Sequence, residues 1–396
     1  GAGGERHLSG MDGDALTLDL APAINNIPAA DWDAVAGSAN PFVTHAFLAA
    51  LEDGQATGGD TGWEAMHLVL HDAGGRLVGA MPHYLKHHSY GEYIFDHSWA
   101  NAFIRAGGDY YPKMLSAVPF TPATGPRFLV GDVPPDRAAQ LRNALANGMV
   151  QYLDRLQLSS AHINFLPEAD IAPLAAQGWM IRSSIQFHWK NDGYRNFDDF
   201  LAALSSRKRK NIRKERRMVA NAGVRLLRLT GDDITSAHID DFYRFYLSTI
   251  DRKWGGAYLT REVFHHLHAS MADRILLVMA EYDGRIIGGA LNFIGSHTLF
   301  GRNWGADLDI PCLHFEACYY QAIEFAIEGG LAHVEAGAQG FHKVQRGYMP
   351  ATTYSAHWVA HDEFRAAIER FLAAERSGID AEINNIEIGA NPFRKG

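Results

Sequence analysis

Alternating apolar and polar runs occur twice in this chain in one and the same arrangement. The segment 72–80 (DAGGRLVGA) lies between two apolar runs, and 283–290 (DGRIIGGA) lies between two others about half the chain later. Because Asp and Gly tolerate positive φ, each copy predicts two strands joined by a tight turn, a β-hairpin. So long a repeat period indicates a duplicated domain rather than a solenoid.

Helical and strand-like spacings alternate through the rest of the chain. Apolar residues at helical spacing predict helices over 28–35, 44–52, 135–156, 171–177, 197–222, 239–250, 261–271 and 315–328, with Thr44 as an N-cap. Strand-like runs occupy 15–20, 113–120, 161–165, 181–189, 224–229, 298–303 and 332–335. We exclude residues 1–13 from fold reasoning.

This order of elements predicts an α+β fold in two tandem domains. We place an N-terminal domain at 14–190 and a C-terminal domain at 191–375. The segment 376–396 shows little periodicity, and we expect it to form a tail over the surface. About 38 extra residues separate the hairpin from the late strand in the first half, and we assign them to 89–135.

Composition narrows the class of protein. No apolar run approaches the roughly 20 residues of a membrane span, so we expect no transmembrane segment. Two cysteines, Cys312 and Cys318, argue against a disulfide framework and suggest a cytoplasmic protein. They lie near His314, but no second Cys/His cluster completes a zinc site, so we expect no metal. The net charge of −9 limits contact with nucleic acid or anionic membrane to local patches.

Several long segments resemble the FemAB-like family of predicted N-acyltransferases. They are 88–96 (HSYGEYIFD), 110–113 (YYPK), 118–127 (VPFTPATGPR), 313–321 (LHFEACYYQ) and 335–348 (EAGAQGFHKVQRGY). The resemblance extends from Trp32 to Trp358. It implies two tandem GNAT-like (acyl-CoA N-acyltransferase) domains, with mixed central sheets flanked by helices, related to the Fem-type peptidoglycan aminoacyl-transferases.

The same resemblance implies a function. It is transfer of an acyl or aminoacyl group, from acyl-CoA or aminoacyl-tRNA, to the amine of a small-molecule or nucleotide-linked acceptor such as a peptidoglycan precursor. No tightly bound cofactor is expected, and acyl-CoA would act as a donor substrate. The alternative is a non-catalytic binder of an anionic precursor or nucleotide, built on degenerate GNAT domains.

The segment 335–348 combines an acid, a histidine, two cations and a phenol. By resemblance, Lys343 stabilises an oxyanion or phosphate with Arg346 as its partner, and His342 is a binding candidate. Tyr348 could protonate the leaving group, and Glu335 could act as a base through a water molecule. The alternative is a turn with solvated cations and a packed tyrosine.

A second candidate lies in the first half, at the loop 120–127 between a strand and a helix. Backbone N–H groups at such a junction can bind a pyrophosphate. Phe120 and Thr121 begin the loop, Gly125 permits close approach of the backbone, and Arg127 could pair with phosphate. With one glycine and two prolines, the loop departs from the glycine-rich GNAT pattern, so a rigid connection remains the alternative.

An aromatic segment supplies two further candidates, Asp96 and Trp99. A carboxyl group in apolar surroundings can have a raised pKa and serve as a general base, which is the role we expect for Asp96. Trp99 is a substrate-binding candidate in the same segment. Alternatively, Asp96 only caps a turn.

A basic run at 207–217 contains eight cationic residues in eleven positions. On a helix, five of them share one face: Arg207, Lys210, Arg213, Lys214 and Arg217. Such a face could hold a nucleotide-linked precursor or a tRNA donor, with Arg213 as a binding candidate, or could contact an anionic membrane peripherally. A solvated helix face is the alternative.

Overall fold

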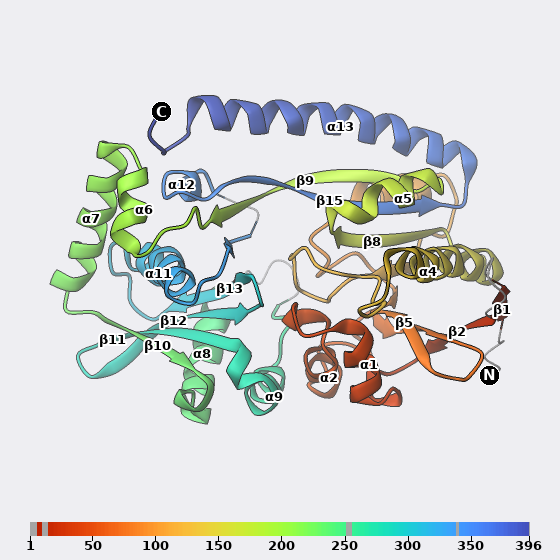
Figure 1. Cartoon of the computed structure of the whole chain (residues 1–396), viewed down its shortest axis with the longest axis horizontal. Coiled ribbons are helices and arrows are strands. Elements are labelled where there is room, and N and C mark those ends of the chain that lie inside the picture. Colours follow the sequence, from red (N-terminus) through yellow and green to blue (C-terminus); the bar gives the residue numbers. More distant parts are fainter. Residues whose placement is uncertain (1–5, 10–14, 251–255, 338–339, 396) are drawn as a thin grey trace. The chain divides into compact units, whose positions relative to one another are not determined.

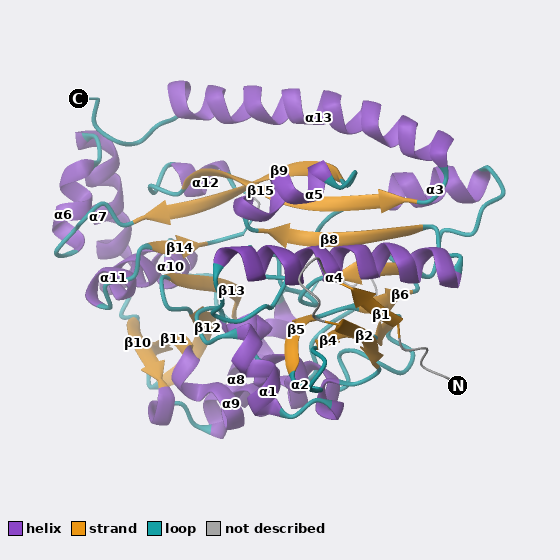
Figure 2. Cartoon of the chain, turned by 45° about the vertical axis from the view of Figure 1, so that its right-hand side comes forward, coloured by secondary structure: helices purple, strands orange, loops and turns teal. Residues whose placement is uncertain are grey.

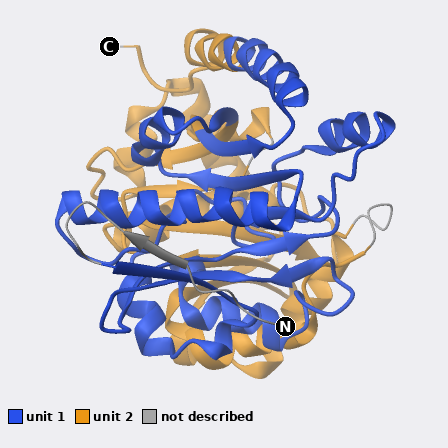
Figure 3. Cartoon of the chain, turned by 90° about the vertical axis from the view of Figure 1, so that its right-hand side faces the viewer, with its two compact units in different colours: residues 1–184, 353–378 blue, residues 185–352, 379–396 orange. Residues whose placement is uncertain are grey.

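The computed structural model describes residues 6–9, 15–250, 256–337 and 340–395, and Figure 1 labels their elements. The chain divides into two compact units. Unit 1 comprises residues 1–184 and 353–378, and unit 2 comprises 185–352 and 379–396 (Figure 3). The divisions fall inside β9 (Met180–Lys190), inside β15 (Met349–Val359) and inside α13 (Asp362–Gly389).

These units correct the predicted domains. The first predicted boundary, at 190, lies close to the observed one at 184. The segment 191–375 is not one unit, because the chain returns to unit 1 through the second half of β15 and the first half of α13. The segment 376–396 is no separate tail, because most of it continues α13.

Unit 1 contains two ladders of strands. The first has the order β1 (Arg6–Ser9), β2 (Ala15–Ala21), β4 (His67–His71), β5 (Leu77–Met81). The second has the order β3 (Trp63–Ala65), β6 (Tyr84–Lys86), β7 (Lys113–Ser116), β8 (Ser160–Leu166), β15. Only β7 and β8 run parallel among these described pairs. The helices are α1 (Ala29–Ala36), α2 (His45–Asp53), α3 (His97–Arg105), α4 (Pro135–Leu156) and α5 (Ile171–Ala176).

The core of unit 1 forms between α4 and the strands. Leu141, Leu145, Met149 and Leu153 recur every fourth residue, so they share one face of α4, and all four are buried. That face packs with buried leucines and isoleucines of β2, β4 and β8. The predicted cap of α2 is confirmed, since the Thr44 hydroxyl accepts from the Phe47 N–H at 3.3 Å.

Unit 2 repeats the plan of unit 1, in which a hairpin precedes a parallel pair of strands. Figure 2 shows the strands in orange and the helices in purple. Its strands are β10 (Arg225–Thr230), β11 (Ile275–Tyr282), β12 (Arg285–Ile294), β13 (Thr298–Ala306), β14 (His333–Glu335) and part of β9, adjacent in that order. Its helices are α6 (Phe197–Ala203), α7 (Ser206–Asn221), α8 (Ser236–Ser248), α9 (Arg261–Met271), α10 (Leu313–Phe315), α11 (Gln321–Glu328), α12 (Phe341–Val344) and the end of α13. A π-helical turn, 316–320, joins α10 to α11.

Both predicted hairpins are confirmed. In the first, a carboxylate oxygen of Asp72 accepts from the N–H groups of Gly74 and Arg76, each at 3.0 Å. In the second, Asp283 and Gly284 have φ of 51° and 71°, as a two-residue hairpin turn of this kind requires. The predicted α+β class is therefore correct.

Three predicted elements differ from the structure, one of them the strand predicted over 113–120, which ends at Ser116. The helix predicted over 197–222 is two helices, α6 and α7, because the chain is extended at Leu204 and the Ser205 N–H donates to Pro392 instead of continuing the helix. The tail predicted from Arg376 is helical to Gly389. Its residues Ile386, Ala390 and Phe393 pack against the core of unit 2, so tertiary packing overrides the weak local pattern.

Candidate functional site

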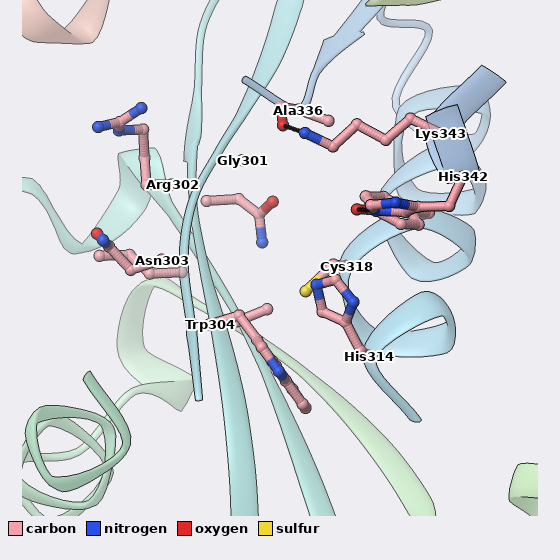
Figure 4. A pocket seen from close by; sticks show the side chains of 13 residues that line it. Gly301, Arg302, Asn303, Trp304, His314, Cys318, Ala336, His342 and Lys343 are labelled. Carbon is pink, nitrogen blue, oxygen red and sulfur yellow. Dashed lines mark hydrogen bonds between the residues drawn. The ribbon is translucent and has the colours of Figure 1, made fainter. Parts of the chain in front are cut away.

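The parallel strands of unit 2 diverge and open a pocket. β13 pairs with β14 only from Thr298 to Phe300, after which β14 ends at Glu335 while β13 continues. The gap beyond this pairing is a pocket of about 250 Å³, lined by residues of β12 and β13, by His314, Cys318 and Tyr319, by Ala336, and by His342 and Lys343 of α12 (Figure 4). None of the described lining residues is an Asp or Glu, whereas Arg302 and Lys343 are cationic.

Lys343 places an ammonium group at this pocket. Its Nζ donates to the main-chain oxygen of Ala336 at 2.5 Å, and only 7% of the residue is exposed. Burial lowers the pKa of Lys343 to about 8, because removing an ammonium from water disfavours its charged form. The group is therefore still mostly protonated at neutral pH, but it releases a proton far more readily than a solvated lysine.

Two histidines line the same pocket (Figure 4). The Nε2 of His342 lies 3.0 Å from the Tyr319 hydroxyl. Burial, aided by the nearby charges of Lys343 and Arg346, lowers the pKa of His342. Burial also lowers the pKa of His314, to about 4. Both imidazoles are consequently neutral near pH 7 and can accept a proton.

The other candidates of segment 335–348 lie around the pocket but do not line it. The Glu335 carboxyl is buried, 3.2 Å from the Nε2 of His188, and burial raises its pKa to about 8. Tyr348 is fully buried, donates to the main-chain oxygen of Tyr319 at 3.2 Å, and has a pKa raised well above its usual value by burial. Its hydroxyl thus bonds to the core.

Arg346 forms an ion pair with the carboxylate of Glu215. Its guanidinium donates to both carboxylate oxygens of Glu215 at 2.8 and 2.9 Å, and to the Tyr320 hydroxyl at 2.9 Å. The same group donates to the main-chain oxygen of His342 at 2.7 Å. Arg346 therefore joins α12 to α7 and orients the residues beside it, with its charge already compensated.

In unit 1 the candidate Asp96 belongs to a buried ion cluster. Its Oδ2 accepts from Lys113 at 2.7 Å and from the Tyr110 hydroxyl at 2.5 Å, and Lys113 also pairs with Glu92 at 2.7 Å. Although burial by itself acts to raise it, the charges of Lys113 and His162 hold the pKa of Asp96 well below its usual range. The expected raised pKa is thus wrong for Asp96, because the sequence did not reveal the buried lysine partner.

The loop 120–127 is held by hydrogen bonds from its own buried arginine, Arg127. Arg127 is 1% exposed and donates to the main-chain oxygens of Gly125 and Ala123 at 3.1 and 3.0 Å. Burial lowers its pKa to about 9. The Thr121 hydroxyl donates to Pro119, and the Phe120 ring lies 5.2 Å from that of Trp63. Within the described structure, these contacts correspond to the rigid connection rather than to an open phosphate site.

The remaining predicted binding residues, Trp99 and Arg213, do not line the pocket of unit 2. Trp99 is 5% exposed on α3, with the Arg182 guanidinium 5.0 Å from its ring centre and the His357 ring edge-on at 5.1 Å. Arg213 is exposed on α7. Among the described ranges, no group of histidines, cysteines and carboxylates is arranged to hold a metal ion.

Sequence reasoning missed most of the pocket wall on β13. Arg302, Asn303 and Trp304 line it. Neither spacing nor composition marks these residues, because their position depends on where β14 stops pairing with β13. Sequence reasoning assigned no binding role to His314 or Cys318, yet both line the pocket.

Each unit contains a hairpin followed by a parallel pair of strands, as expected for tandem GNAT-like α+β domains. The chain is a member of the FemAB-like family, described as peptidoglycan biosynthesis/recognition, whose family model matches residues 23–395. No curated protein sequence matches the chain. In the part of the chain that the structure describes, no helix has the length and apolarity to cross a membrane.

Solved structures share the fold. FemX matches with a TM-score of 0.54 and 12% identity, over 87% of this chain and 98% of that one. The C-terminal domain of a putative lysylphosphatidylglycerol synthetase from Agrobacterium fabrum gives 0.54 and 10%, over 87% and 95%. A protein of unknown function from Bacteroides thetaiotaomicron gives 0.51 and 13%, over 85% and 98%. At such identities the likeness extends to the fold alone.

Proposed function

We propose that this protein is an N-acyltransferase that moves an acyl or aminoacyl group onto the amine of a peptidoglycan precursor, with the pocket of unit 2 holding the donor's carbonyl group. The observation that carries the proposal is the Lys343 ammonium at a pocket lined by no described carboxylate. An uncompensated buried cation favours a ligand that is anionic or becomes anionic as it reacts. A cytoplasmic location, where nucleotide-linked precursors and aminoacyl-tRNA occur, is part of the proposal.

The proposed chemistry assigns two steps to Lys343 and one to His342. The acceptor nitrogen attacks the donor carbonyl carbon, forming the C–N bond while the carbonyl oxygen gains negative charge. Lys343 donates a hydrogen bond to that oxyanion. Neutral His342 accepts the proton that the amine loses. The intermediate then expels the leaving oxygen of aminoacyl-tRNA or the sulfur of acyl-CoA, and Lys343, with its pKa of about 8, supplies the proton that this group takes up.

The test is product formation by the full chain, followed by mass spectrometry. Acetyl-CoA and aminoacyl-tRNA serve as donors, with a UDP-linked muropeptide as acceptor. Lys343→Met keeps an unbranched side chain that is one atom shorter but removes its charge, so we expect kcat/KM to fall about 10²- to 10³-fold. Lys190→Met, an exposed lysine at the end of β9, is the matched control and should retain full activity. For the unaltered chain, kcat/KM should fall above about pH 8, as Lys343 loses its proton.

Two results would contradict the proposal. One is a Lys343→Met variant with the activity of the control. The other is tight binding of the muropeptide by the unaltered chain without turnover of either donor, which would favour the non-catalytic binder.

A further inference from the structure

α7 carries a row of cations that face away from the core of unit 2. Ile212 and Val219 mark its buried face. At about 100° per residue, five cationic positions fall on the opposite side of the helix. They are Arg207, Lys210, Arg213, Lys214 and Arg217, and all five are exposed. The row predicted from the sequence therefore exists on the folded helix.

The remaining basic residues of α7 are engaged, and this distinguishes them from the row. Arg216 pairs with Glu316 at 3.0 Å and with Glu324 at 2.8 Å. Lys208 donates to Gln345, and Arg209 to the main-chain oxygen of Leu204. By contrast, the five cations of the row form no ion pair or hydrogen bond with any described residue. The acid of this run, Glu215, is neutralised by Arg346.

The fold adds two cations from the other end of the sequence. The Ser205 N–H donates to Pro392 at 2.9 Å, and the Arg394 N–H donates to Ala203 at 3.0 Å. These bonds fix residues 392–394 beside the start of α7, with Arg394 and Lys395 exposed. We call the five cations of the row, together with Arg394 and Lys395, the basic surface.

We propose that the basic surface docks this protein onto an anionic phospholipid bilayer. Its row extends about 15 Å from Arg207 to Arg217, so several headgroups can meet it at once. Long flexible cations without partners suit a fluid array of lipid phosphates. Each cation adds to the binding free energy, and salt weakens every one of these contacts by screening. The chain carries a net charge of −9, so attraction to such a surface has to come from a local group of cations, and the basic surface is such a group.

The composition of the surface favours lipid over RNA. Proteins that hold single-stranded nucleic acid combine cations with aromatic rings on which bases stack. α7 contains no aromatic residue. Phe393, beside the two C-terminal cations, packs against the core of unit 2. The basic surface thus offers charge without a stacking platform.

The experiment is co-sedimentation of the full chain with phosphatidylglycerol vesicles and with phosphatidylcholine vesicles. The patch variant replaces Arg207, Lys210, Arg213, Lys214 and Arg217 by Gln, which keeps the helix and removes side chains that have no described partner. The matched control replaces five exposed cations elsewhere by Gln, so that the net charge falls equally: Arg76, Arg105, Lys190, Arg285 and Arg370. Melting temperatures of both variants verify that they fold.

We expect the unaltered chain and the control to bind phosphatidylglycerol vesicles, and to release them as salt is raised from 50 to 500 mM. The patch variant should bind at least tenfold more weakly, and Arg394→Gln with Lys395→Gln should give an intermediate loss. Equal binding by the patch variant and the control would overturn the proposal. So would binding of mixed tRNA that the patch variant loses, in the absence of vesicle binding, because that result would assign the basic surface to RNA.

Discussion

Burial sets the ionisation of the two residues that frame the pocket of unit 2. The pKa of Glu335 rises to about 8 and that of Lys343 falls to about 8, because a poorly solvated site disfavours a charge of either sign. In unit 1, Asp96 and Lys113 are buried just as deeply but lie 2.7 Å apart, and each stabilises the other's charge. A nearby partner, rather than depth alone, therefore decides whether a buried group stays ionised.

The shift at Glu335 predicts a pH-dependent stability. Its pKa is raised on folding, so the folded protein keeps a proton that the unfolded chain loses above pH 4.5, and this residue lowers stability as pH rises from 4.5 towards 8. Glu335→Gln removes that penalty. We expect the variant to match the unaltered chain at pH 4.5 and to be more stable by about 1–3 kcal/mol at pH 8.5. Denaturant unfolding across this range measures the difference, and an equal gain at both pH values would contradict the cause given.

Sequence alone pointed to Lys343 and His342, which line the pocket, since their resemblance to a family motif requires no knowledge of contacts. It could not show that Arg127 is directed into its own loop or that Glu215 neutralises Arg346. Those facts depend on which residues of distant segments meet. The sequence shows which side chains are charged, but it does not show which of those charges are already paired within the protein.

At the scale of elements, local signals worked where a turn or a cap is chemically determined. The two Asp/Gly turns and the cap at Thr44 are examples. They failed at α13, where a weakly periodic segment becomes a 28-residue helix. Ile368 and Leu372 are buried at one end of it, and Ile386 packs at the other, so contacts at both ends compensate for a poor local pattern.

Substitution of two glycines by alanine, one in a helix and one in a turn, is expected to change stability in opposite directions. Gly378 lies inside α13, is exposed, and has no neighbour within 4 Å of an added Cβ, so Gly378→Ala should stabilise the protein by about 1 kcal/mol through helix propensity. Gly284 has equally open space but a φ of +71°, so Gly284→Ala should destabilise by about 1 kcal/mol through backbone strain. Thermal unfolding of both variants checks the signs, and destabilisation by Gly378→Ala would argue against a continuous helix there.

At the scale of the whole molecule, the units interleave in sequence. β8 of unit 1 pairs with β15, from Tyr354 with Leu166 to Val359 with Ser160, although about 190 residues separate the two strands. Ile368 and Leu372 of α13 pack with Trp99 in the same unit. A duplicated pattern correctly predicts two tandem copies, but no local feature reveals that the end of the chain completes the first of them.

This interleaving predicts the behaviour of fragments. A fragment of residues 1–190 follows the boundary read from the sequence, but it lacks 353–378 and leaves the edge of β8 unpaired beside an uncovered apolar cluster. Unpaired edges and exposed apolar surface promote aggregation, so we expect this fragment to be insoluble or to unfold without cooperativity. Co-expression with 191–396 supplies the missing strand and helix and should give a soluble complex with a cooperative transition. Cooperative unfolding of 1–190 alone would mean that β8 and Trp99 do not need β15 and α13, and that the first copy folds independently of the end of the chain.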